Sequence, residues 1–146
     1  MMLRTLLIGL ALALAAALSA HADSRVSMDD LRFSTPRKND FRKGEQNLER
    51  RPVKWESDAA WLITIEAVDA ELGISDDGKY YKPLSDLQFR LSQNNTWIEL
   101  RQQAQEFARG ERGKGTFTVD WRVLLDITKD RPGRYRAELR ITITEL

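Results

Sequence analysis

The sequence of 146 residues contains no cysteine and a single histidine, His21. The absence of cysteine excludes disulfide bonds and the usual structural zinc sites. Outside His21 there is no imidazole to act as a general base in a Ser-His-Asp arrangement. Carboxylate pairs remain possible catalytic groups, but no pair stands out for chemistry such as glycoside hydrolysis. We therefore expect a protein that is not an enzyme and that needs no cofactor.

The first 22 residues have the pattern of a secretory signal peptide. Arg4 gives a short basic start, an unbroken apolar run extends from Leu6 to Leu18, and Ala20-His21-Ala22 supplies a small-x-small cleavage site. The apolar run is short for a membrane span, and no stop-transfer pattern follows it. We expect residues 1–22 to be cleaved and the protein to lie in the periplasm or outside the cell, with no membrane span after cleavage.

Cleavage removes both His21 and Arg4 from a chain with 23 basic and 22 acidic residues. The remaining chain, residues 23–146, therefore has a formal charge near zero. Its length suits a single domain with one hydrophobic core. A charged stretch at 37–51, nearly devoid of apolar residues, is interpreted as an exposed connection, because such charge runs are usually solvated.

Alternating apolar residues predict several β-strands after this connection. The alternation is clearest in "AAWLITIEAV", in "TFTVDWRVLLDI" and in the closing "RYRAELRITITEL". Residues expected in the core share the apolar parity of these segments. They are Trp61, Ile63, Ile65, Phe89, Leu91, Phe117, Val119, Trp121, Leu139 and Ile141.

Turn residues indicate the structure of the segments between these strands. "LQFRLSQNNTWIEL" predicts a hairpin in which Phe89 faces Leu100 and Arg90 faces Glu99 across an Asn94-Asn95 turn. A short strand is expected through Phe107, and the region 69–86 is expected to be a long loop. Pro132-Gly133 suits the middle of a type II turn. With about seven strands and no long helix, the prediction is an all-β, antiparallel β-sandwich.

The strand order and one turn motif resemble bacterial secreted immunoglobulin-like domains, some of which occur in surface and pilus-associated proteins. The resemblance covers residues 53–146 and includes Pro132-Gly133-x-Tyr135. It implies that Tyr135 forms a tyrosine corner, in which the hydroxyl ties a turn to the backbone. It also implies a structural or interaction role at the cell surface or in the periplasm, including pilus assembly or adhesion.

Pilus subunits of this kind accept a strand from a partner, which raises the question of what covers the closing strand of this chain. One hypothesis is strand addition by other envelope or pilus proteins. The alternative, favoured from the sequence, is that a strand of the same chain covers that edge. Residues 134–145 are then expected to pair with the "TFTVDW" segment or with the N-terminal strand.

Aromatic residues suggest a second class of function, a small carbohydrate- or ligand-binding module. Exposed aromatic side chains form platforms for sugars or for protein partners. The candidates for ligand or partner contact are Trp97, Tyr80, Tyr81 and Trp55. The structural alternative is that these side chains are covered by their own domain.

Acidic residues in the 69–86 region suggest a calcium site, since calcium takes six to eight oxygen ligands. The candidate ligands are Asp69, Glu71, Asp76 and Asp77, with Asp86 at the end of the segment. Their spacing matches no EF-hand, and acidic loops are common on solvated surfaces. Arginines 134, 136 and 140 are interpreted as a solvated sheet face, so nucleic acid is not an expected partner.

Overall fold

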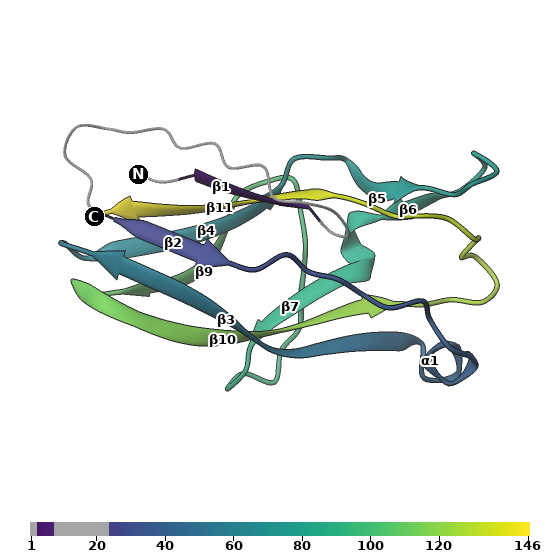
Figure 1. Ribbon diagram of the computed structural model, residues 1–146, viewed down its shortest axis with the longest axis horizontal. Helices are drawn as coiled ribbons and strands as arrows, with labels where there is room; N and C mark the ends of the chain where they lie inside the picture. The colour runs from purple at the N-terminus through teal and green to yellow at the C-terminus, as the bar shows by residue number, and fades with distance from the viewer. Residues whose placement is uncertain (1–2, 8–23) are drawn as a thin grey trace.

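Two antiparallel sheets pack face to face in the computed structural model, which describes residues 3–7 and 24–146 (Figure 1). The five-stranded sheet has the order β2 (Arg25–Met28), β3 (Glu45–Ser57), β10 (Gly113–Leu124), β7 (Leu87–Leu91) and β8 (Ile98–Glu99). The four-stranded sheet has the order β1 (Leu3–Leu7), β11 (Glu138–Glu145), β4 (Trp61–Ala67) and β9 (Gln105–Gly110). The predicted all-β antiparallel class is confirmed.

Small elements complete one end of the sandwich. β5 (Glu71–Ile74) and β6 (Tyr81–Pro83) form a two-stranded hairpin, followed by a 3-10 turn at Leu84–Asp86. The short helix α1 (Lys38–Lys43) lies at the same end (Figure 1). The helix ends at Gly44, whose φ of 72° is a conformation that glycine adopts without strain.

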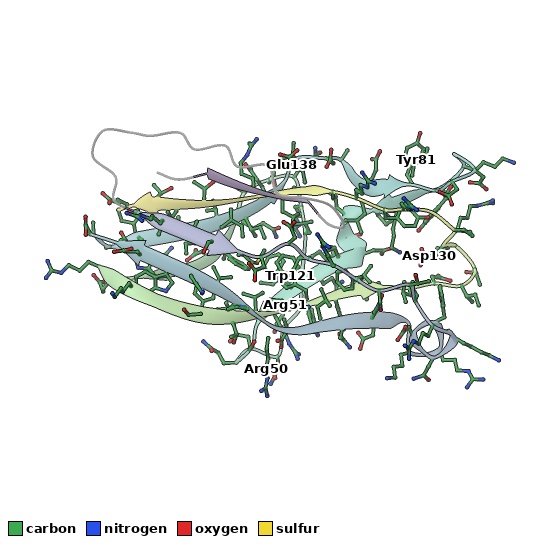
Figure 2. The ribbon with its side chains drawn as sticks, viewed as in Figure 1. Arg50, Arg51, Tyr81, Trp121, Asp130 and Glu138 are labelled. Atoms are coloured by element: carbon green, nitrogen blue, oxygen red, sulfur yellow. The ribbon has the colours of Figure 1, made fainter. Side chains whose placement is uncertain are left out.

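The core lies between the sheets because the alternating strands turn their apolar parity inward. Phe107 of β9 contacts Phe89 and Trp121 of the opposite sheet, with ring centroids 5.3 and 6.4 Å away. Figure 2 shows Trp121 between the two layers. Eight of the ten predicted core residues are buried; Leu91 and Phe117 are half-buried at the margin of the core.

The prediction of a connection at 37–51 was wrong, since the segment contains α1 and the first half of β3, but its described side chains are exposed or half-buried, as predicted. β3 pairs with β10, and the side chains of Arg50, Lys54 and Glu56 are exposed; Figure 2 shows Arg50 pointing away from the core. The pairing register shifts between Val119 and Trp121, so that β3 has an extra residue at this point. The resulting β-bulge breaks the period of two, which is why the sequence pattern did not predict the part of β3 that precedes the bulge.

Asp120 stabilises this bulge. Arg50, at the bulge, has a φ of 54°, and its backbone N–H donates to Asp120 Oδ1 over 3.0 Å. The same carboxylate accepts from Ser92 Oγ at 2.9 Å and from Arg90 Nε at 3.2 Å. Burial on its own raises the pKa of Asp120, but these three hydrogen bonds outweigh it and hold the pKa below its ordinary value.

The lowered pKa predicts how an Asp120→Asn variant depends on pH. At pH 7 the variant should be about 1–3 kcal/mol less stable than the wild type, because hydrogen bonds to a charged group are lost. The pKa of Asp120 is lower in the folded protein than in the unfolded chain, where it is about 4. The ionised carboxylate therefore stabilises the fold above about pH 4, and this stabilisation is lost as the pH falls through the pKa of the folded state. The stability difference should therefore shrink below about pH 4 in urea titrations. Glu111→Gln, at an exposed carboxylate, is the control, and a pH-independent difference would contradict this role.

Three further sequence expectations were also wrong. The 69–86 region is not a long loop, since it contains β5 and β6. The predicted 88–99 hairpin exists, but Phe89 pairs with Ile98 and Gln88 with Glu99, two residues out of the expected register. Gly133 does not have the positive φ of a type II turn. A glycine fits there because a Cβ would lie 2.9 Å from Ser75 Cα.

Candidate functional site

The first candidate site is the edge of β11 that faces away from β4. β11 begins at Glu138 rather than at the predicted residue 134, and Leu139 to Glu145 pair with β4. One of its two predicted partners, the "TFTVDW" segment, lies in β10 of the other sheet. Leu139, Ile141 and Ile143 are at most 1% exposed, so this strand forms part of the core.

Backbone hydrogen bonds show which residues of β11 direct their N–H and C=O groups toward β4 and which direct them toward the other edge. Glu138 C=O accepts from Val68 N, and Leu146 N donates to Ala60 O, each over 2.8 Å, so these even-numbered residues face β4 and its flanks. In an antiparallel ladder, successive residues direct their N–H and C=O groups to opposite sides. Leu139 and Ile141 therefore direct their backbone groups toward the other edge.

That other edge is paired by β1, in which Leu6 lies opposite Leu139 and Arg4 opposite Ile141. β1 belongs to the predicted signal peptide; the rest of that segment lies outside the described residues. The N-terminal strand that follows, β2, belongs to the other sheet and pairs with β3. Just before β2, Ser24 Oγ donates to Glu145 Oε1 at the end of β11 over 2.7 Å.

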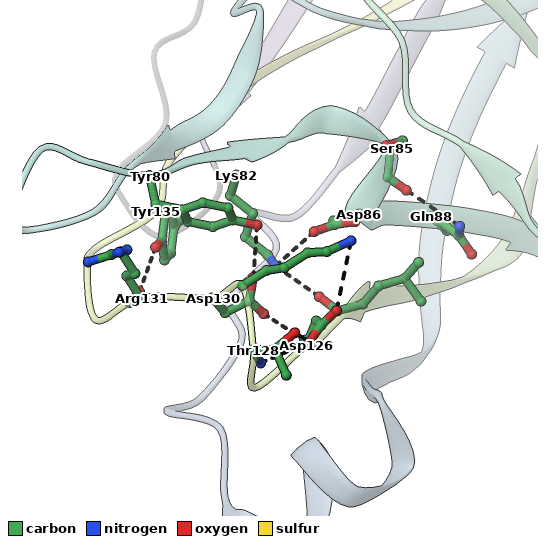
Figure 3. Close-up of polar contacts among 12 residues, drawn as sticks. Tyr80, Lys82, Ser85, Asp86, Gln88, Asp126, Thr128, Asp130, Arg131 and Tyr135 are labelled. Carbon is green, nitrogen blue, oxygen red and sulfur yellow. Dashed lines mark hydrogen bonds and ion pairs between the residues drawn. The ribbon is translucent and has the colours of Figure 1, made fainter.

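The second candidate site is a polar cluster at the opposite end of β11, centred on Lys82 (Figure 3). Lys82 is 3% exposed, and its Nζ donates to Asp130 Oδ1 at 2.8 Å, Asp86 Oδ2 at 2.9 Å and Leu124 O at 2.9 Å. Three acceptors satisfy the three donors of the ammonium group. The cluster thereby ties β6 to the loop that follows β10.

Two tyrosines complete this cluster. Tyr135 donates its hydroxyl to Arg131 O over 2.5 Å, the contact expected of a tyrosine corner. Tyr80 donates to Asp130 Oδ1 over 3.0 Å, and its ring meets that of Tyr135 edge-on. Burial, with a further contribution from the hydrogen bond to Asp130, raises the pKa of Tyr80 above its ordinary value. The two hydroxyls hold the turn and remain protonated at neutral pH.

The four aromatic candidates for ligand contact do not come together. Two guanidinium groups lie over the ring of Trp97, with Arg90 and Arg122 each 4.4 Å from the ring centroid. Trp55 packs against Trp61 at 4.4 Å, between the sheets. Tyr80 belongs to the Lys82 cluster, and Tyr81 alone is strongly exposed, at 58%. These positions do not form a stacking platform for a sugar.

The acidic candidates are also used separately. Asp69 Oδ2 accepts from Glu138 N over 2.7 Å, whereas Asp77 accepts from Ser75 Oγ, Lys79 N and Arg131. These bonds, first of all that from Ser75, lower the pKa of Asp77. Within residues 3–7 and 24–146, no three acidic or histidine side chains are placed to hold a metal ion. The geometry does not support the calcium hypothesis.

No family model, curated protein or solved structure matches this chain. In the part of the chain that the structure describes, no helix is long and apolar enough to cross a membrane.

The features of these sites that the sequence did not predict are Lys82 and its acceptors. Tyr81, Lys82 and Pro83 form a three-residue strand, too short for its alternation to be visible. Its inward residue is a lysine, which a hydrophobic pattern assigns to the surface. Only the tertiary pairing with Asp86 and Asp130 explains this burial.

Proposed function

We propose that the protein is an exported, non-enzymatic interaction module that accepts a strand from a partner along β11. One observation carries the proposal: the backbone partner of β11 on this edge is β1, and β1 lies within the predicted signal peptide. When residues 1–22 are cleaved, Leu139 and Ile141 lose that partner. An edge strand with free N–H and C=O groups is a template for pairing with another chain.

The order of the strands supports the same proposal. In an immunoglobulin constant-type sandwich, strands A, B, E and D form one sheet and C, F and G the other. Along the first sheet, the neighbouring strands β2, β3, β10 and β7 correspond to A, B, E and D. In the second sheet, β4 and β11 correspond to C and F. β1 then occupies the place of G, beside F. Strand addition at this place completes the sandwich with a segment from elsewhere.

The partner is thus a protein of the periplasm or the cell surface that offers an extended segment. Backbone pairing supplies affinity in such complexes, and alternate side chains supply specificity. The polar groups of the Lys82 cluster bond to one another, which supports a structural role for them rather than a catalytic one.

A peptide that mimics β1 tests this proposal. A fluorescent peptide spanning residues 2–8 should bind saturably to the protein that lacks residues 1–22. The matched control peptide carries Leu6→Pro, because proline removes the N–H at the position opposite Leu139. We expect the control peptide to bind at least about tenfold more weakly, because it loses one or two backbone hydrogen bonds.

Equal binding of the two peptides would show that the contact is not a backbone ladder. No binding of either peptide, with the protein folded, would show that the edge does not accept a strand of this register. Either result contradicts the proposed function.

A further inference from the structure

A cavity of about 780 Å³ lies at the end of the sandwich that carries the Lys82 cluster. Its volume falls in the range of small-molecule sites, roughly 300–1,000 Å³. Segment 33–36, α1 and the loop between β10 and β11 surround it. Its apolar walls are formed by Phe33, Phe41, Leu72, Leu125 and Ile127.

Ile127 exposes a large apolar side chain to solvent at the wall of this cavity. Its side chain is 75% exposed at the cavity wall, the highest exposure among the large hydrophobic residues described. Leu125, two residues earlier, is only 9% exposed. The apolar wall therefore continues from the core into a region that solvent reaches.

The charges that line the cavity are unevenly compensated. Lys82 pairs with Asp130 and with Asp86, and Arg131 pairs with Asp77 at 2.8 Å. Arg134 and Arg136 also line the cavity and are exposed, yet they make no ion pair with any residue in the described ranges. Two guanidinium groups without an ion pair in the described ranges therefore lie beside an apolar wall.

The geometry points to a binding site for a single-chain amphiphile with an anionic head group, such as a fatty-acid carboxylate. The alkyl chain lies against the wall formed by Phe41, Leu125 and Ile127, and removes Ile127 from water. The head group accepts hydrogen bonds from Arg134 and Arg136, whose planar guanidinium groups match a carboxylate. This site is separate from the proposed strand-accepting edge, and its existence does not depend on that function.

Titration of the purified protein with decanoate, kept below its critical micelle concentration, tests the site. Calorimetry should show one decanoate bound per chain, whereas butyrate, which has the same head group and little chain, should bind at least about tenfold more weakly. The double variant Arg134→Gln/Arg136→Gln should also lose at least about tenfold in affinity, since it removes charge-assisted hydrogen bonds. Arg112→Gln, at an exposed arginine of the β9–β10 turn, is the matched control and should bind as the wild type does.

A second variant, Ile127→Glu, tests the wall at a position that is already exposed and so leaves the fold intact. It places a carboxylate beside the alkyl chain and should weaken decanoate binding by a similar factor. Backbone amide shifts should change at residues 125–127 and 134–136. Absence of decanoate binding, equal affinity of wild type and the arginine double variant, or shifts confined to β11 would overturn this assignment.

Discussion

Replacing Lys82 with alanine is expected to destabilise the protein by about 3–5 kcal/mol, because it leaves carboxylates without their counter-ion. The side chain of Asp130 is 10% exposed and that of Asp86 is 23% exposed, so water replaces the ammonium group incompletely. The carbonyl of Leu124 loses its donor as well. The urea midpoint of unfolding should fall accordingly, with the m-value unchanged.

Lys79→Ala provides the matched control for this variant. Lys79 is exposed in the same β5–β6 hairpin, and its removal should change stability by no more than about 0.5 kcal/mol. A Lys82→Ala variant that unfolds at the wild-type midpoint would show that Asp86 and Asp130 are solvated. The cluster would then not hold the end of the sandwich.

The second large effect is expected from Leu139→Ala and from Ile65→Ala. Both side chains are fully buried, on β11 and on the adjacent β4, and each truncation should cost about 2–5 kcal/mol through lost burial and a residual cavity. Thermal or urea unfolding measures this loss. Unchanged midpoints in both variants would contradict the observed burial.

Thr142→Ala is the control on the same strand. Thr142 pairs with Thr64 on the opposite face of the sheet from Leu139, where it is half-buried. Its replacement removes only a cross-strand contact and should cost no more than about 1 kcal/mol. A cost as large as that of Leu139→Ala would show that β11 has no distinct core face.

Much of the fold could be predicted because several strands combine one buried and one wet face. β4 and β10 were predicted from their period-two alternation, and the core residues followed from it. The hydroxyl contact of Tyr135 was implied by the resemblance of its turn motif to that of immunoglobulin-like domains. These features depend on residues close together in the sequence.

The rest depends on contacts between distant residues, which periodicity does not record. The first half of β3 was missed because the bulge at Arg50 changes its parity, and the bulge is stabilised by Asp120, seventy residues away. The partner of β11 was missed because β4 and β10 have equally regular patterns, and only the tertiary fold distinguishes between them. Lys82 was missed because its burial requires two carboxylates, one of them from the loop after β10.

Amide hydrogen exchange along β11, in the protein without residues 1–22, tests the strand-accepting edge most directly. The amides of Arg140 and Thr142 face β4 and should exchange slowly, whereas those of Leu139 and Ile141 face the open edge and should exchange quickly. Addition of the residue 2–8 peptide should slow exchange at Leu139 and Ile141 and leave Arg140 and Thr142 unchanged. Uniform slow exchange from Leu139 to Thr142 without any peptide would show that the edge is already paired within the chain, and would contradict strand acceptance.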